Sequence, residues 1–240
     1  MTPSIPHPLI VAHRGASASA PENTLAAFTL AVAQDADGIE VDVRRTADDV
    51  LVLHHDPMLP DGSPIVERTF GEVRQITSGI ATLDDLLGVA GDLLINIEIK
   101  NAAGEPDFDP ERRVADAVVA WVLHHQLAWR AVVTSFDSDM VDRVRSVDST
   151  SAIVTGQLTS STDDLERTIA EVAVRRHAWV APSHRSLDPD PGHIVSVAHD
   201  LGLKVMVWTV DDPVRIRQLA VAGVDAVITN DPASANDALA

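Results

Sequence analysis

The sequence predicts an α/β fold, a (β/α)8 TIM barrel formed by a single domain over residues 1–240. Short apolar runs typical of strands alternate with longer amphipathic runs of helical spacing, and the pair repeats eight times. A chain of about 250 residues is usual for this barrel. No stretch rich in Pro, Gly or Ser divides the chain, so we expect no second domain.

The predicted strands are rich in leucine and β-branched residues, as strands covered on both faces are. In chain order they span 9–12, 38–43, 93–99, 131–134, 152–155, 178–181, 204–209 and 225–229. The predicted helices span 24–34, 82–89, 111–125, 138–146, 163–175, 193–201, 214–222 and 233–239. Asn23 or Thr24 suits the cap of the first helix, and Pro213 suits a first helical turn. Gly202 and Gly223 stand where helices should end.

One further apolar run, 50–54, follows the second strand after too few residues for a parallel crossover, which needs about a dozen. We therefore expect it to return antiparallel as a hairpin. A turn centred between Ala47 and Asp48 pairs Glu40 with His55. An open doubly wound sheet is the competing fold, but the first strand leads into HRGAS rather than a glycine-rich phosphate loop.

Composition narrows the classes of partner and site. The chain has 18 Lys+Arg against 36 Asp+Glu, a formal net charge of −18, so we expect no nucleic-acid partner. It has no cysteine, which excludes thiol catalysis and iron–sulfur clusters. The initial MTPSIPHP lacks the basic and apolar regions of a signal peptide, and no apolar run is long enough for a membrane span, so we expect neither. We expect a cytoplasmic protein, and a homo-oligomer is compatible with the sequence.

Acidic side chains gather at the predicted carboxyl ends of the strands, where barrels of this type hold their active sites. Glu40 and Asp42 are two residues apart on the second strand and so share one face, and Glu98 lies on the third. Paired carboxylates on a strand are usually solvated, but at the mouth of a barrel they are costly without a cation. Three hard oxygen ligands suit one divalent cation, Mg²⁺ or Ca²⁺, better than zinc.

Basic and aromatic side chains are expected at the same rim. His13 and Arg14 end the first strand, Lys100 follows Glu98, and the hairpin delivers His55 beside the carboxylates. Two histidines with a Lys/Arg pair suit phosphoryl chemistry with an acid and a base. Lys100 could instead only neutralise Glu98. Trp208, at the end of the seventh predicted strand, is either core or a wall of the substrate site.

Five segments carry a resemblance to the glycerophosphodiester phosphodiesterases. They are AHRGASASAPENTLAAF at 12–28, IEVDVRRTADDVLVLHHDP at 39–57, INIEIK at 95–100, WTVDD at 208–212 and GVDAVITNDP at 223–232. The resemblance implies a (β/α)8 barrel with a divalent cation, often Ca²⁺ or Mg²⁺, that hydrolyses glycerophosphodiesters to an alcohol and glycerol 3-phosphate.

Carried over by residue, the resemblance makes His13 and His55 the acid–base pair. It makes Glu40, Asp42 and Glu98 the metal ligands. Arg14 and Lys100 would contact the phosphate. In some members the second histidine contacts the metal, which leaves His55 open as a ligand. The chain departs from the family pattern at Asp49, where glycine is favoured, at Asp211, where asparagine is frequent, and over 58–73.

We therefore expect a metal-dependent phosphodiesterase that acts on a small glycerophosphodiester, with the glycerol 2-hydroxyl attacking phosphorus to close a cyclic phosphate. One alternative is a lysophospholipase-D-like activity on longer lipids, which an exposed apolar lip would favour. The other is a catalytically silent barrel that binds phosphorylated ligands, which the loss of a histidine or acidic ligand would indicate.

Overall fold

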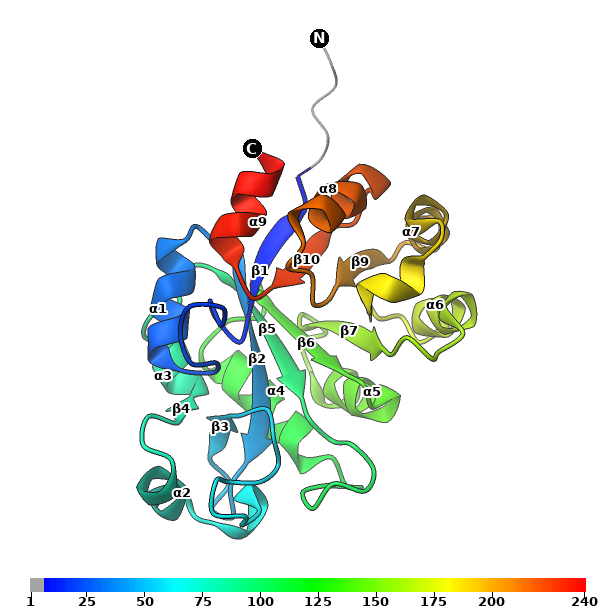
Figure 1. Cartoon of the computed structure of the whole chain (residues 1–240). Helices are drawn as coiled ribbons and strands as arrows, with labels where there is room; N and C mark the ends of the chain where they lie inside the picture. Colours follow the sequence, from blue (N-terminus) through cyan, green and yellow to red (C-terminus); the bar gives the residue numbers. More distant parts are fainter. Residues whose placement is uncertain (1–6) are drawn as a thin grey trace.

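The computed structural model describes residues 7–240, and eight parallel strands in it close into a barrel (Figure 1). The strand β1 pairs with the last strand on one side and with the second on the other, which completes the ring. The strands are β1 (Leu9–His13), β2 (Gly38–Arg45), β5 (Leu94–Ile99), β6 (Ala131–Ser135), β7 (Val154–Thr159), β8 (Trp179–Pro182), β9 (Lys204–Val207) and β10 (Ala226–Thr229). The predicted TIM barrel is confirmed. The absence of a signal peptide was predicted on residues 1–8, which lie mostly outside the described residues.

A helix follows each barrel strand and covers its outer face (Figure 1). These helices are α1 (Leu25–Ala33), α3 (Leu83–Leu87), α4 (Arg113–His124), α5 (Ser138–Val147), α6 (Leu165–Val174), α7 (Pro191–Asp200), α8 (Pro213–Ala222) and α9 (Pro232–Leu239). Five begin at an aspartate whose carboxylate accepts from a backbone N–H of the first turn, which stabilises the helix start: Asp137, Asp164, Asp190, Asp212 and Asp231. Within residues 7–240, no helix combines the length and the apolar character needed to cross a membrane.

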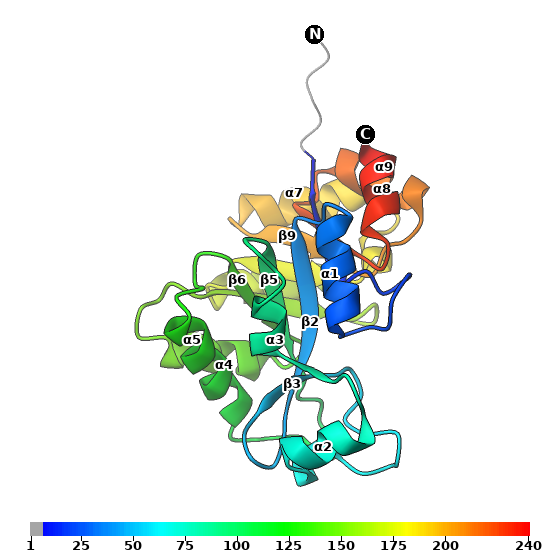
Figure 2. The same cartoon turned by 90° about the vertical axis from the view of Figure 1, so that its left-hand side faces the viewer.

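The chain between β2 and α3 forms an excursion beyond the carboxyl end of β2 (Figure 2). It contains β3 (Leu51–Leu53), the 3-10 turn η1 (Ile65–Glu67), α2 (Phe70–Ile76) and β4 (Ala81–Thr82). The sequence predicted only its first strand. Five buried apolar side chains give the excursion a small core of its own: Val52, Leu59, Ile65, Val73 and Ile80.

The hairpin is antiparallel, as predicted, but the predicted pairing of Glu40 with His55 is wrong. Val43 lies opposite Leu53, and the N–H of His54 donates to the carbonyl of Asp42 at 3.0 Å. The register is therefore displaced by one residue from the predicted one.

The displaced register follows from the hairpin turn, which has three residues instead of two. Thr46 and Val50 close the turn through the Thr46 N–H and the Val50 carbonyl, 3.0 Å apart. Asp49 adopts a left-handed φ of 65°, a conformation that ends three-residue hairpin loops. Asp49 is also the position at which the resembled family favours glycine.

The predicted strand at 152–155 begins and ends too early. The strand β7 runs to Thr159 because Gly156 and Gln157, which interrupt the apolar pattern, are both buried within it. The side-chain amide of Gln157 donates to backbone carbonyls of Ser135 and Phe136, so a polar residue is accommodated in a buried strand.

Candidate active site

The turn after β1 brings a backbone amide and a guanidinium to the mouth of the barrel. Arg14 and Gly15 have left-handed φ angles of 55° and 83°. A Cβ on Gly15 would lie 2.6 Å from the carbonyl carbon of Ala27 in α1, so only glycine fits there. In this conformation the Arg14 N–H donates to Glu40 Oε2 at 3.0 Å, and Arg14 Nε lies 2.8 Å from Asp42 Oδ2.

Glu40, Asp42 and Glu98 are all buried, and one oxygen from each lies within 4.8 Å of the others. Burial, together with the charges of Asp42 and Glu98, raises the pKa of Glu40 well above its ordinary value. Burial also raises the pKa of Glu98, although Lys100 opposes the shift. For Asp42 burial acts upward, but Lys100 and Arg14 outweigh it and lower the pKa.

The donor set fits a divalent cation. Glu40 Oε1 is buried and has no hydrogen-bond partner among residues 7–240, which is costly for a carboxylate oxygen. An ion between the three carboxylates would satisfy that oxygen and offset their mutual repulsion. Carboxylate oxygens are the ligands that Mg²⁺ and Ca²⁺ prefer.

Lys100 and Asn23 complete the surroundings of Asp42. Lys100 Nζ lies 2.8 Å from Asp42 Oδ1 and also bonds Glu98, so it neutralises Glu98. Lys100 also lines a cavity at this end of the barrel. The buried side-chain amide of Asn23 donates to Asp42 Oδ2 at 2.9 Å. Thr24, not Asn23, caps α1. The sequence predicts Asn23 only as a possible helix cap, and its place in the PENT stretch of the resembling segment 12–28 is the signal that points to a role at the site.

His13 lies at the end of β1 and faces the carboxylates. Its Nε2 is 4.0 Å from Glu40 Oε2, and its Nδ1 is 2.7 Å from Asn230 Oδ1. Burial, followed by the charge of Arg14, lowers the pKa of His13, so the neutral ring is favoured.

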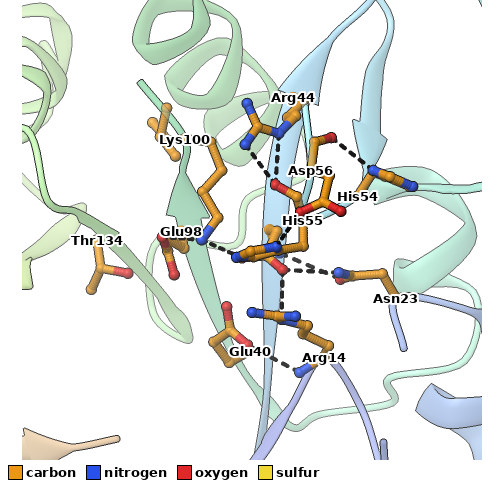
Figure 3. Close-up of polar contacts among 12 residues, drawn as sticks. Arg14, Asn23, Glu40, Arg44, His54, His55, Asp56, Glu98, Lys100 and Thr134 are labelled. Carbon is orange, nitrogen blue, oxygen red and sulfur yellow. Dashed lines mark hydrogen bonds and ion pairs between the residues drawn. The ribbon is translucent and has the colours of Figure 1, made fainter. Parts of the chain in front are cut away.

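His55 reaches the site from the segment after β3, although its predicted register is wrong. Its Nδ1 lies 2.7 Å from Asp56 Oδ1. The buried Arg44 donates to the His55 carbonyl from Nε at 2.9 Å and from Nη2 at 2.6 Å, which fixes this part of the chain. Figure 3 shows Arg14, Glu40, Glu98 and Lys100 turned toward a common space with His55 at its edge.

These side chains line one cavity of about 260 Å³. Its lining includes His13, Arg14, Glu40, His55, Glu98, Lys100 and Trp208. A second cavity, of about 470 Å³, adjoins it and shares His55, Glu98, Lys100 and Phe136. Trp208 is a cavity wall: its Nε1 donates to the Ala181 carbonyl at 2.8 Å, and its ring meets Phe136 edge to face with centroids 5.5 Å apart. Phe136 and Asn230 could not be identified from the sequence pattern, because neither stands out by residue type.

Comparison with known proteins agrees with the geometry. A glycerophosphodiester phosphodiesterase of Caldanaerobacter subterraneus is 28% identical over 241 residues, covering 93% of this chain and 94% of the relative. A probable glycerophosphodiester phosphodiesterase 1 of Mycobacterium tuberculosis is 31% identical, covering 94% and 90%. Among solved structures, an Oleispira antarctica phosphodiesterase in complex with sn-glycerol-3-phosphate has a TM-score of 0.84 at 25% identity, covering 97% of this chain and 96% of that one.

A putative glycerophosphoryl diester phosphodiesterase of Silicibacter pomeroyi has the same TM-score, 0.84, at 26% identity, covering 99% of this chain and 94% of that one. The sequence model of the glycerophosphoryl diester phosphodiesterase family matches residues 13–234, which include both histidines and all three carboxylates. The chain therefore belongs to the glycerophosphoryl diester phosphodiesterase family and is an enzyme of that class.

Proposed function

We propose that this protein hydrolyses small glycerophosphodiesters to an alcohol and glycerol 3-phosphate, using His13 and His55 as acid and base and one divalent cation, Mg²⁺ or Ca²⁺. One observation carries the proposal: both histidines and the carboxylates Glu40 and Glu98 line a single cavity of about 260 Å³, and Asp42 lies within 4.8 Å of the other two carboxylates. Arg14 and Lys100 are the cations beside the phosphate. The product bound to the Oleispira antarctica relative is sn-glycerol-3-phosphate, which supports this choice of substrate.

The cation would be held by Glu40, Asp42 and Glu98, and when bound it would neutralise charge on the phosphate. One histidine removes the proton of the glycerol 2-hydroxyl, whose oxygen then bonds to phosphorus. The bond from phosphorus to the head-group oxygen breaks, and the other histidine protonates that oxygen. Water then adds to phosphorus, the ring bond to the 2-oxygen breaks, and the two histidines exchange roles. An attacking group within the substrate gains a large effective molarity, worth up to about 7–11 kcal/mol.

The second cavity, of about 470 Å³, adjoins the first and offers room for a head group. A lysophospholipase-D-like activity is the second candidate. Phe108 and Phe136 line this cavity and are 40% and 47% exposed, which gives it a small apolar lip. The silent-barrel alternative has less support, since both histidines and all three carboxylates are present.

The test is a panel of glycerophosphocholine, glycerophosphoethanolamine and lysophosphatidylcholine, each with Mg²⁺, Ca²⁺ or Mn²⁺, with glycerol 3-phosphate and free head group as readouts. We expect glycerol 3-phosphate from the first two substrates. Faster release of head group from lysophosphatidylcholine would favour the second candidate, and no turnover of any substrate would favour the silent barrel. Full activity after exhaustive chelation would refute the metal dependence.

The cyclic step has its own test. A substrate analogue without the 2-hydroxyl should be nearly inert, because the internal nucleophile is missing. We would compare kcat/KM for the analogue and for the glycerophosphodiester of the same head group at saturating metal. Similar values would mean that water attacks phosphorus directly.

A further inference from the structure

Asn230 lies between His13 and Asp211 where the barrel closes. It follows the last strand, β10, and its Oδ1 is 2.7 Å from Nδ1 of His13 at the end of β1. Its Nδ2 donates to Asp211 Oδ2 at 2.7 Å. Hydrogen bonds therefore connect His13 in the candidate site, through Asn230, to Asp211 in the loop after β9.

The contacts of Asp211 fix which way the Asn230 amide faces. Asp211 Oδ1 accepts from the backbone N–H of Asn230 at 2.8 Å and from the Thr229 hydroxyl at 3.0 Å. An ionised carboxylate can only accept, so the Asn230 atom that faces Oδ2 must be the donating Nδ2. The other end of the amide, which faces His13, is then the accepting oxygen. The Ser17 hydroxyl lies 2.8 Å from that atom and 2.7 Å from the His13 carbonyl, and because a hydroxyl both donates and accepts, the assignment rests on Asp211.

An accepting oxygen at 2.7 Å requires His13 Nδ1 to carry a proton. In the neutral ring Nε2 then has a free lone pair, and Nε2 is the nitrogen that faces the cavity, 4.0 Å from Glu40 Oε2. We propose that Asn230 and Asp211 are positioning residues that hold His13 in the Nδ1–H tautomer, so that His13 is the histidine that accepts the proton in the first step. The part of this inference that concerns proton transfer rests on the proposed function.

The partner of the other histidine is consistent with this division. His55 Nδ1 meets the carboxylate of Asp56, whereas His13 meets a neutral amide oxygen. With His13 as the proton acceptor, His55 is the histidine left to protonate the departing alcohol. Asp211 stands where the resembled family often has asparagine, so fixing the tautomer through a carboxylate at this position is proposed for this chain and not for every member of the family.

The tautomer can be measured without substrate or metal. In a protein labelled with ¹⁵N in its histidine rings, the protonated and unprotonated nitrogens of a neutral imidazole have well separated shifts. We would record two-bond ¹H–¹⁵N spectra above the ordinary histidine pKa of about 6.5 and assign His13 by its absence in the His13→Gln variant. We expect the proton on Nδ1. A proton on Nε2 in the unmodified protein would overturn the inference.

Asp211→Asn should reverse the tautomer. An asparagine at 211 can keep its oxygen on the Asn230 and Thr229 donors, but it then presents an NH₂ to the NH₂ of Asn230. The Asn230 amide must turn over and offer NH₂ to His13 Nδ1, which moves the ring proton to Nε2. We expect kcat to fall by about 10-fold to 10⁴-fold, with KM nearly unchanged because Asp211 does not touch the substrate cavity.

Exchanging the two residues should restore the arrangement. In the double variant Asn230→Asp with Asp211→Asn, the new carboxylate accepts from both His13 Nδ1 and the new amide. Asn230→Asp alone places two carboxylates side by side and should also lower kcat. We expect the double variant to recover the Nδ1–H tautomer and most of the lost kcat, a coupling that two independent structural effects would not produce.

Asp212→Asn is the matched control, because Asp212 is the adjacent aspartate but caps α8 through Val214 N at 3.0 Å. It should change neither the tautomer nor kcat, and thermal melting would show that each variant is folded. An Asp211→Asn protein with an unchanged tautomer and kcat would overturn the inference. A folded, fully active His13→Gln protein would instead refute the catalytic role of His13 in the proposed function, whatever the tautomer.

Discussion

The three buried carboxylates at the mouth of the barrel are compensated unequally. Asp42 forms ion pairs with Arg14 and Lys100 and accepts a hydrogen bond from the side-chain amide of Asn23. Glu40 receives one backbone N–H from Arg14 and keeps one oxygen without a partner among residues 7–240. In the absence of a bound cation, the charge of Glu40 is therefore the least stabilised of the three, as its raised pKa also indicates.

Glu40→Gln should separate the contribution of this residue to stability from its contribution to activity. A carboxyl with a raised pKa in the folded state lowers the stability of the protein as the pH rises from the ordinary carboxyl pKa toward the raised one, so the metal-free variant should be at least as stable as the unmodified protein near neutral pH. Activity should fall by at least about 100-fold, because a metal ligand matters more than its outer partners do. Urea unfolding with a chelator and with added Mg²⁺ or Ca²⁺ measures the stability.

Added cation should stabilise the unmodified protein, by about 2.7 kcal/mol at 100 times Kd, and should stabilise the Glu40→Gln variant much less. Glu166→Gln, on the surface helix α6, is the control and should respond to the cation as the unmodified protein does. If the added cation stabilised the Glu40→Gln variant as much as the unmodified protein, Glu40 would not be a metal ligand.

Gly15→Ala should be strongly destabilising. The substitution combines a left-handed φ of 83° with a Cβ 2.6 Å from the backbone of Ala27. Gly62 has nearly the same φ, 82°, with nothing within 4 Å, so Gly62→Ala reports the backbone strain alone, about 1 kcal/mol. In urea unfolding, we expect Gly15→Ala to lower the free energy of unfolding by about 1–3 kcal/mol more than Gly62→Ala does. Equal decreases would mean that α1 can shift to accommodate the added Cβ.

At the scale of elements, the excursion between β2 and α3 is anchored to the barrel through Arg44. This buried guanidinium donates to the His55 carbonyl on one side. On the other it bonds Glu105 Oε2 at 3.0 Å and Asp107 Oδ2 at 2.5 Å, both in the loop before α4. One side chain thus joins the hairpin, the His55 segment and the loop that lines the larger cavity.

Arg44→Lys should loosen this junction while keeping its charge, because a lysine cannot bond the carbonyl and both carboxylates at once. We expect a loss of about 1–3 kcal/mol in the free energy of unfolding and a lower kcat, since the His55 segment is no longer fixed. Arg167→Lys, an exposed pair with Glu171 on α6, is the control and should change stability by less than about 0.5 kcal/mol. Equal effects of the two substitutions would show that Arg44 does not position His55.

The elements also show which parts of the fold could be predicted from the sequence. Apolar runs and strand-end acids were sufficient to predict the barrel and the proximity of Glu40, Asp42 and Glu98, because period and position are local properties of a sequence. The hairpin register was not, since it depends on whether Asp49 accepts a left-handed φ. The contact of His13 with Asn230 could not be predicted from the sequence either. These residues are 217 positions apart and meet only because the barrel closes.

For the whole molecule, stability below neutral pH should depend on histidines that are buried in neutral form. The side chain of His177 is 0% exposed, with Nδ1 2.9 Å from the Thr155 hydroxyl. Burial lowers its pKa, Asp142 opposes the shift, and Arg145 and Arg175 add to it. The unfolded chain therefore binds a proton more readily at this residue than the folded protein does.

His177→Gln should flatten the decline of stability on the acid side. In the unmodified protein the His177 contribution is full above the unfolded pKa of about 6.5 and is lost as the pH falls below it. The two curves of unfolding free energy against pH should converge by up to about 1.4 kcal/mol per pH unit in that window. Urea unfolding at intervals of pH measures the difference, and parallel curves would contradict the prediction.

The pairing of β1 with β10 also has a consequence for the order of events during synthesis. Asn230 is synthesised long after its partner His13, because the two residues are 217 positions apart. A nascent chain that has not yet released β10 has all three carboxylates, Arg14, Lys100 and both histidines, but it lacks the contact between His13 and Asn230. We therefore expect enzymatic activity to appear in one late step, when β10 pairs with β1 and the barrel closes, so that an incomplete chain stays inactive.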